Sequence, residues 1–452
     1  MTYIDDTIVA AATPPGVGGV AIVRVSGHDV ERVAERMLGR VPQSHRATVC
    51  DFSDGSGTVI DRGLALYFAG PQSFTGESVL EFHAHGGPMI VGSLLDAVVA
   101  LGARRAEPGE FSKRAYLNGK LDLVQAEAIA DLISAGTRQA AQAALRSLSG
   151  AFSMAVADLD ASLTNLRLHV EAAIDFPEEE IDFLSDRALE ERIRACRNQF
   201  AQLSTSAERG RVLSDGCQIV IAGEPNVGKS SLLNALAGQD AAIVTPHAGT
   251  TRDVLRERVN LDGLAVEFVD TAGLREDAES IEAEGIRRAQ TALQEADVAL
   301  WVLDAAGDDR SDNNNSDRAA PASLADLPTL IVRNKIDLTD DTPGISAGNE
   351  STINLSAKTG AGIDSLIAAI KALAGYSETH EGAFSARRRH LEALARAEQH
   401  FREGVRALEQ ERAGELFAEE LKLARQALGS ITGELSSDDL LGKIFAEFCI
   451  GK

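Results

Sequence analysis

The first part of the chain carries short apolar runs separated by glycine and proline. The runs TIVAAAT, GVAIVRVSG, GLALYFAG and SVLEFHAHGG all lie before about residue 120. Each run is bounded by turn-forming residues, which is typical of β-strands. The pattern predicts an α+β domain over residues 1–120.

From Leu121 to about Ala207 the sequence becomes rich in Ala, Leu, Glu and Arg. Apolar residues recur there at steps of three and four, the spacing that places them on one stripe of a long helix. Such a stripe must be buried against other helices. Its residues are Leu145, Leu148, Phe152, Val156, Leu159, Leu163, Leu166, Val170 and Ile174.

Between Cys217 and Tyr376, strand-like apolar runs alternate with helical segments. The runs are CQIVIAG, AVEFVD, VALWVLD, TLIVRNK and TINLSA. Alternation of this kind is typical of a doubly wound α/β domain with a mainly parallel sheet.

A helical pattern returns after Tyr376. The simplest arrangement packs the two helical halves into one bundle, with the α/β domain inserted between them. Contiguous domains that never meet are the alternative. The second apolar stripe consists of Phe417, Leu421, Ala424, Leu428 and Ile431, and it is followed by Leu441, Ile444, Phe445 and Phe448.

These patterns divide the chain into four segments. We expect an N-terminal domain, the first part of a helical domain, an inserted α/β domain, and a second helical part that ends in CIGK. Their predicted ranges are 1–120, 121–214, 215–376 and 377–452.

Composition indicates a globular protein of the cytoplasm. The chain has 452 residues, of which 44% are hydrophobic and 25% charged. Its four cysteines show no CxxC spacing, which argues against a disulfide framework or a cysteine zinc site and suits a reducing compartment. The start, MTYIDDTIVA, lacks the basic region of a secretory signal, and no apolar run approaches the ~20 residues that cross a bilayer.

The C-terminal CIGK has a cysteine where a prenyl group is attached in some proteins. Gly451 and Lys452 do not fit that motif, so we expect no membrane anchor. The formal net charge of −24 repels nucleic acid on average, and any contact with nucleic acid must therefore be local.

A phosphate-binding loop is predicted by QIVIAGEPNVGKSS. Residues 223–230 fit G-x-x-x-x-G-K-[ST], directly after an apolar strand. Lys229 would neutralise charge on the β- and γ-phosphates, and the Ser230 hydroxyl would hold Mg²⁺. Backbone N–H groups that can wrap a phosphate at a helix N-terminus come from Asn226, Val227, Gly228, Lys229, Ser230 and Ser231.

Three further motifs follow in order, each at the end of an apolar run. DTAG supplies Asp270, which can reach the magnesium through water, with Thr271, Ala272 and Gly273 beside the γ-phosphate. NKID and SAK supply Asn334, Lys335 and Asp337, then Ser356, Ala357 and Lys358. The Asp337 carboxylate can accept bonds from the N1–H and the 2-amino group of guanine, which adenine lacks. The motifs therefore predict a guanine-nucleotide site.

A switch loop is predicted by AGTTRD, which lies between the first two motifs. Thr251 would complete the Mg²⁺ shell only while the γ-phosphate is present. Hydrolysis also needs a group that orients water, and Leu274, directly after DTAG, cannot do so. The nearby carboxylates that could do this are Glu276, Glu279, Glu282 and Glu284.

The chain as a whole resembles the MnmE (TrmE) family of GTPases that modify uridine in tRNA. The matching blocks are TPPGVGGVAIVRVSG, GESVLEFHAHGG, RAEPGEFSKRAYLNGKLDL, GEPNVGKSSLLNAL, GTTRD, DTAGLRE and CIGK, in the family's order. The resemblance implies that the N-terminal domain is folate-binding-like and dimerising, and that the inserted domain is the GTPase (G) domain.

The resemblance also implies roles for individual residues of the G domain. Glu282 matches the family's water-orienting residue and would be catalytic together with Lys229. A potassium ion would bind beside the phosphates, through Asn226 and a loop that contains Thr245, His247 and Thr250. His247 stands where the family often has an apolar residue, but the expected ligand there is a backbone carbonyl.

The ends of the chain are implied to form a folate site. The family's folate-binding residues match Arg24, Glu81 and Lys120, with Lys452 contributing from the C-terminus. The tail would fold back into this site, where Cys449 is a candidate for chemistry. The cofactor would be 5-formyl- or methylene-tetrahydrofolate.

The resemblance finally implies an overall activity. The protein would form a homodimer, join an FAD-dependent partner in a heterotetramer, and use a potassium-dependent GTP cycle. A carboxymethylaminomethyl-type group would be installed at carbon 5 of the wobble uridine of certain tRNAs. The alternative is a regulatory or ribosome-assembly GTPase whose ends are docking surfaces without one-carbon chemistry.

Overall fold

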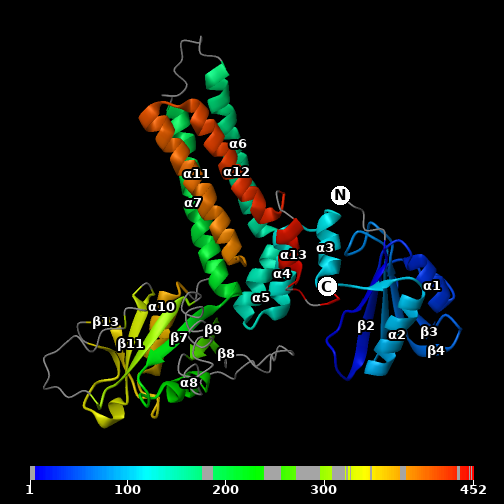
Figure 1. The fold of residues 1–452 in the computed structure, drawn as a ribbon, viewed down its shortest axis with the longest axis horizontal. Coiled ribbons are helices and arrows are strands. Elements are labelled where there is room, and N and C mark those ends of the chain that lie inside the picture. Colours follow the sequence, from blue (N-terminus) through cyan, green and yellow to red (C-terminus); the bar gives the residue numbers. More distant parts are fainter. Residues whose placement is uncertain are drawn as a thin grey trace, which may run out of the picture. The chain divides into compact units, whose positions relative to one another are not determined.

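The computed structural model describes residues 6–175, 187–238, 256–270, 296–307, 321, 324–325, 327–346, 349–376, 383–434, 438–446, 448 and 450–451. The chain forms two compact units (Figure 1). The first unit consists of Met1–Ala130, Ser147–Cys196 and Arg396–Lys452, and the second of Asp131–Arg146 and Arg197–Ala395.

The first unit begins with a six-stranded sheet in the order β3-β4-β5-β2-β1-β6. All neighbouring strands are antiparallel except β1 and β6. The strands are β1 (Ile8–Ala11), β2 (Gly18–Ser26), β3 (Thr48–Ser53), β4 (Val59–Phe68), β5 (Val79–Gly86) and β6 (Arg104–Arg105).

One face of this sheet is covered by α1 (Val30–Leu38) and α2 (Pro88–Ala100), whose apolar residues share one core with alternate strand residues. The opposite face carries a cross-strand row of less buried side chains. This row runs from Val49 through Leu64 and His83 to Ile22, which are successive Cα partners. The next pair along β2 and β5 is Arg24 and Glu81.

Helices from both ends of the chain pack together in this unit. Leu123 and Ala126 share a core with Leu441, Ile444, Phe445 and Phe448. Further along, both guanidinium nitrogens Nε and Nη2 of Arg425 donate to the Asp160 carboxylate, at 2.8 and 2.9 Å. The predicted bundle of two helical halves is therefore confirmed. The helices concerned are α3 (Glu110–Leu117), α4 (Leu123–Ser134), α6 (Ala151–Asp175), α12 (Gly414–Thr432) and α13 (Asp438–Ala446).

The predicted first stripe is wrong in one respect, because it is not a single helix. α5 (Arg138–Leu148) ends before α6 begins, and Gly150 between them has a φ of 91°. This left-handed conformation suits glycine and ends a helix. Leu145, assigned to the stripe, is 56% exposed, whereas Phe152 and most later members are buried.

The second unit contains a seven-stranded sheet in the order β12-β13-β11-β10-β7-β9-β8. Its five central strands are parallel, and β12 and β8 join the edges antiparallel. The predicted doubly wound α/β domain is confirmed. Its elements are β7 (Cys217–Gly223), α8 (Lys229–Ala237), β8 (Arg256–Leu261), β9 (Leu264–Asp270), β10 (Val298–Asp304), β11 (Thr329–Asn334), the 3₁₀ helix η3 (Ile336–Leu338), β12 (Gly344–Ser346), β13 (Asn349–Asn354) and α10 (Ile363–Leu373).

Parts of the helical segments also belong to this second unit. Ala143 of α5 lies in the core of the parallel sheet, and its carbonyl accepts a 3.2 Å hydrogen bond from the N–H of Ser385. Two long helices, α7 (Arg187–Ser214) and α11 (Arg388–Glu411), contribute residues to both units. The domain boundaries at 120, 214 and 376 stay a prediction.

None of the helices formed by the described residues combines the length and the apolar character needed to cross a membrane.

Candidate guanine-nucleotide site

The predicted nucleotide residues gather at one edge of the parallel sheet. Gly223, Asp270, Asp304 and Asn334 each close a strand, and β7, β9, β10 and β11 are parallel neighbours. The carboxyl ends of parallel strands meet at the same edge, where doubly wound folds bind ligands. The motifs that lie far apart in the sequence are thereby brought together.

The loop between β7 and α8 curls around a lysine. Lys229 opens α8 and is 8% exposed, and its Nζ donates to the carbonyls of Gly223 at 3.0 Å and Glu224 at 2.8 Å. Asn226 has a φ of 66°, a conformation that asparagine adopts more readily than most residues. The loop thus directs the lysine charge and the first N–H groups of α8 to one place, which suits an anion.

Asn334 joins this loop to the SAK motif. It is 2% exposed, its Nδ2 donates to the Val227 carbonyl at 2.8 Å, and its Oδ1 accepts from the Ala357 N–H at 3.0 Å. A Cβ at Gly228 would collide with the Asn334 side chain, so only glycine fits there. Asn334 therefore fixes the phosphate loop against the SAK motif.

Lys335 makes a second link between the two loops. Its Nζ donates to the Asn226 carbonyl at 2.7 Å and to Oδ2 of Asp304 at 2.6 Å. Burial acts to raise the pKa of Asp304, but the hydrogen bond and charge of Lys335 outweigh it and hold this pKa below its usual range. The sequence analysis missed Asp304, although it is the last residue of the apolar run VALWVLD.

The carboxylate predicted to recognise the base, that of Asp337, is held by a serine. Oδ1 of Asp337 accepts a 2.6 Å hydrogen bond from the buried Ser356 hydroxyl. Asp337 itself is exposed, and among the described residues no donor reaches its other oxygen. That oxygen is available for a base edge, while Lys358 is exposed two residues after Ser356.

The remaining predicted residues of the loop are also near this edge. Ser230 and Ser231 lie exposed in the first turn of α8. Asp270, at the end of β9, is the Cα partner of Ile221 in β7. Ten predicted site residues lie outside the described residues: Thr245, His247, Thr250, Thr251, Thr271, Ala272, Gly273, Glu282, Cys449 and Lys452.

A second constellation lies on the open face of the sheet in the first unit. Arg24 donates from Nε to Oε1 of Glu81 at 2.8 Å, and His83 contacts the other Glu81 oxygen at 3.1 Å. The rings of Phe74 and Phe111 lie 5.7 and 5.8 Å from the Arg24 guanidinium carbon. The motifs did not reveal these aromatic and histidine neighbours, because they come from separate segments.

Lys120 is exposed, and its Nζ donates to the Pro71 carbonyl at 3.1 Å. The C-terminal tail reaches the same part of the unit. Ile450 forms a bridge with Pro108, and the Gly451 carbonyl accepts a 3.4 Å bond from Arg24.

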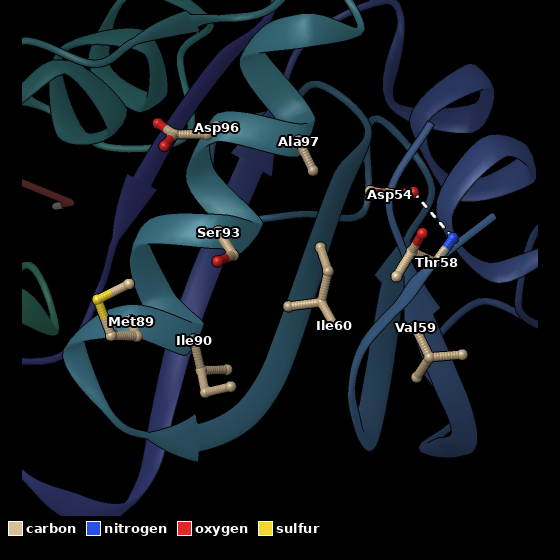
Figure 2. A pocket seen from close by; sticks show the side chains of 9 residues that line it. All are labelled: Asp54, Thr58, Val59, Ile60, Met89, Ile90, Ser93, Asp96 and Ala97. Carbon is tan, nitrogen blue, oxygen red and sulfur yellow. Dashed lines mark hydrogen bonds between the residues drawn. The ribbon is translucent and has the colours of Figure 1, made fainter. Parts of the chain in front are cut away.

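A cavity of about 460 Å³ lies elsewhere in this unit, between α2 and the β3–β4 hairpin (Figure 2). Its two carboxylates are already engaged. Asp54 accepts from Ser56 and Thr58, and Asp96 pairs with Arg105 at 2.8 Å. None of the predicted site residues lines this cavity.

The strand, loop and helix with Lys229, together with Asn334 and Asp337 at the end of β11, define a P-loop GTPase. Residues 123–449 match the MnmE helical domain, and residues 7–120 match the family described as GTP-binding protein TrmE N-terminus. The chain belongs to the MnmE family of tRNA modification GTPases, and it is a GTP hydrolase.

Curated relatives match over their whole length. The tRNA modification GTPase MnmE of Coxiella burnetii strain Dugway is 51% identical over 100% of both chains. That of Yersinia pestis strain Angola is 53% identical over 99% of both. Among solved structures, Era from Aquifex aeolicus bound to GDP and AlF₄⁻ shares 28% identity over 41% of this chain and 66% of its own, with a TM-score of 0.26.

Proposed function

We propose that this GTPase acts on tRNA, where it installs a carboxymethylaminomethyl-type group at carbon 5 of the wobble uridine. The observation that carries the proposal is the full-length match to relatives named tRNA modification GTPase. A match confined to the G domain would fit any GTPase switch, whereas this one includes both ends of the chain. We place the activity in the cytoplasm.

The one-carbon unit would come from 5-formyl- or methylene-tetrahydrofolate bound at the open sheet face. The donor set supports this assignment. A carboxylate such as Glu81 accepts from N–H groups of a pterin, and cationic side chains such as Lys120 suit a glutamate tail. The tail residue Gly451 contacts Arg24, which brings the C-terminal segment to the same group of residues. When bound, the folate supplies the one-carbon group.

Magnesium would be held at the nucleotide by Ser230 and, from the switch loop, by Thr251. The exposed hydroxyl of Ser230 in the first turn of α8 supports this, because Mg²⁺ prefers oxygen ligands and retains several waters. The bound ion supplies positive charge at the phosphates. Lys229 contributes a second fixed charge from within the loop.

A potassium ion would bind beside the phosphates, through Asn226 and the loop with Thr245, His247 and Thr250, and Glu282 would orient water. The exposed side chain of Asn226 supports its part in this site, since its backbone is held by Lys335. Hydrolysis should be much faster in K⁺ than in Na⁺ at matched ionic strength. Asn226→Gly removes the amide without straining the positive φ, and it should abolish the difference. Equal rates of the parent protein in the two salts would remove potassium from the proposal.

A homodimer would form through the open face of the N-terminal sheet. Val49 is 62% exposed and Leu64 41%, and they are cross-strand partners on this face. Apolar side chains on an unpartnered sheet face favour association. An FAD-dependent partner would complete a heterotetramer and make most tRNA contacts, since the net charge of −24 opposes wide contact with phosphates.

The test is a mass-spectrometric comparison of wobble uridines. Cells that lack this gene should lose the C5 modification, the parent gene should restore it, and Lys229→Ala should not. If the modification is complete in the deleted cells, the protein is a switch without one-carbon chemistry. Folate titration of the purified protein separates the same alternatives directly.

A further inference from the structure

Three potential metal ligands meet between two helices of the first unit. His400 and Glu403 lie on α11, and Glu420 lies on α12. Their ligand atoms all lie within 4.8 Å of one another, and none of the three belongs to the nucleotide or folate constellations. Nδ1 of His400 is 2.7 Å from Oε2 of Glu420.

The sequence and the packing explain why these groups meet. His400 and Glu403 are three residues apart, so they share one face of α11. Gly404 follows at once, and a Cβ there would lie 2.9 Å from the Cβ of Glu420. The missing side chain lets α12 approach α11 closely at this level, and Glu420 is thereby carried to the imidazole.

We propose that His400, Glu403 and Glu420 bind a divalent transition-metal ion of the Zn²⁺ class. Zinc binds imidazole nitrogen and carboxylate oxygen, and its three-ligand sites can combine the two donor types, as the His₂Glu set does, with water in the fourth position. The metal would take the place of the proton between Nδ1 of His400 and Glu420, and the bound imidazole would carry a single proton on Nε2, with any second proton released to solvent. Mg²⁺ is disfavoured, because an imidazole ligand suits zinc, copper and nickel better than a hard cation.

The geometry needs only a small closure. Ligands of a tetrahedral ion at about 2.0–2.1 Å lie roughly 3.3 Å apart, so no present separation needs to shrink by more than about 1.5 Å. Glu403 is exposed, and its carboxylate accepts one 2.9 Å hydrogen bond from the Gln399 amide. Its side chain can move inward because only this bond has to break. The side chains of His400 and Glu420 are 33% and 26% exposed, which leaves a path for the ion. The bound ion would join α11 to α12 in place of a single hydrogen bond.

Thiols of this chain can compete for zinc. Burial raises the pKa of Cys196 to about 11 and that of Cys217 to about 12, so both thiols stay protonated at neutral pH. Experiments must still distinguish zinc bound at the proposed site from zinc bound by Cys50 or Cys449. Single substitutions of His400, Glu403 and Glu420 make this distinction.

The test is calorimetric titration of the chelator-treated full-length protein with Zn²⁺, in excess Mg²⁺ so that the nucleotide site does not interfere. Co²⁺ absorption is a second readout, and it should lack a thiolate charge-transfer band. We expect one site per chain, and we expect affinity to fall at least about tenfold in His400→Gln and in Glu420→Gln.

Glu419→Gln is the matched control, since Glu419 is the neighbour of Glu420 on α12 and pairs with Lys422. It should keep the parent affinity within about twofold. Glu403→Gln tests the exposed ligand, whose loss poses little risk to folding, and it should also weaken binding. Absence of a stoichiometric site in the parent protein would overturn the proposal. Binding that His400→Gln, Glu403→Gln and Glu420→Gln leave unchanged would do the same and would assign the zinc to thiols.

Discussion

Arg24 and Gly451 lie 427 positions apart, yet the Arg24 guanidinium donates from Nη1 to the Gly451 carbonyl at 3.4 Å. The same guanidinium pairs with Glu81 at 2.8 Å. One side chain therefore connects the start of the chain, the central strand β5 and the C-terminal tail. A change at Arg24 should disturb the proposed folate site and leave the G domain intact.

The first prediction follows from this connection. Arg24→Lys keeps the charge but cannot contact Glu81 and the tail together, because lysine lacks the planar fork. Tetrahydrofolate affinity should fall at least about tenfold, which equals about 1.4 kcal/mol of binding free energy, with the GTPase rate unchanged. Isothermal titration measures the affinity. Arg62→Lys on the exposed part of β4 is the control and should bind folate normally. Equal folate affinity in both variants would argue against the folate assignment.

The second prediction concerns Asn334. Asn334→Ala leaves the Val227 carbonyl and the Ala357 N–H without their buried partner. Each unpaired group should lower the free energy of unfolding by about 1–3 kcal/mol. The melting temperature of the G domain and the affinity for labelled GDP should both fall. Asn234→Ala, on the exposed side of α8, should change neither. If Asn334→Ala binds GDP like the parent, the link between the two loops has no energetic role.

The third prediction concerns Asp304, which acts through Lys335. Asp304→Asn retains the shape but removes the charge that pairs with the lysine at 2.6 Å. We expect weaker GTP binding by about three- to tenfold, seen mainly in KM rather than kcat. Lys335→Met should weaken GTP binding more than Asp304→Asn does. The loss of binding free energy in the double variant should be smaller than the sum of the two single losses, since both changes remove the same contact. Asp340→Asn, on an exposed residue, serves as the control. Fully additive losses would contradict a role of Asp304 through Lys335.

The fourth prediction is a pH dependence that originates at Asp215. Burial raises the pKa of this carboxyl to about 6, with Asp131 and Asp297 adding to the rise while Arg387 and Arg211 oppose it. The folded state then binds a proton that the unfolded state has lost between pH 4 and 6. The free energy of unfolding should therefore fall over this range through Asp215 and stay level above it, and the fall should be small because solvent screens this exposed residue.

Asp215→Asn removes this dependence. The variant should gain stability relative to the parent as the pH rises from 4 to 7, measured as the difference between their denaturant midpoints. Asp364→Asn, on an exposed residue of α10, should run parallel to the parent at all pH values. A constant offset between Asp215→Asn and the parent would show that the carboxyl does not titrate in this window.

The nucleotide loop and the parallel sheet could be predicted from the sequence because each motif directly follows an apolar strand. Local pattern fixes which residues end a strand, and parallel topology then brings those ends together. The contacts of Asn334 with Val227 and of Lys335 with Asp304 could not be predicted in the same way. They depend on strand order, in which β10 lies between β7 and β11.

The helical segments show the limit of periodicity. The steps of three and four continue through Gly150, but the positive φ of this residue ends one helix before the next begins. The pairing of Arg425 with Asp160, and the position of Ala143 in the core of the parallel sheet, arise from contacts between segments far apart in the sequence. Amphipathic spacing shows that a face is buried, but not which partner buries it.

The two loops that would hold the nucleotide are anchored by different side chains, Asn334 for the phosphate loop and Ser356 for the carboxylate of Asp337. The base specificity can therefore be changed without weakening the binding of the phosphates. An amide at position 337 offers one donor and one acceptor, which matches the edge of xanthine rather than that of guanine. Such a variant would hydrolyse xanthosine triphosphate, which other GTPases do not use. Its hydrolysis rate could then be measured in a cell lysate that contains many other GTPases.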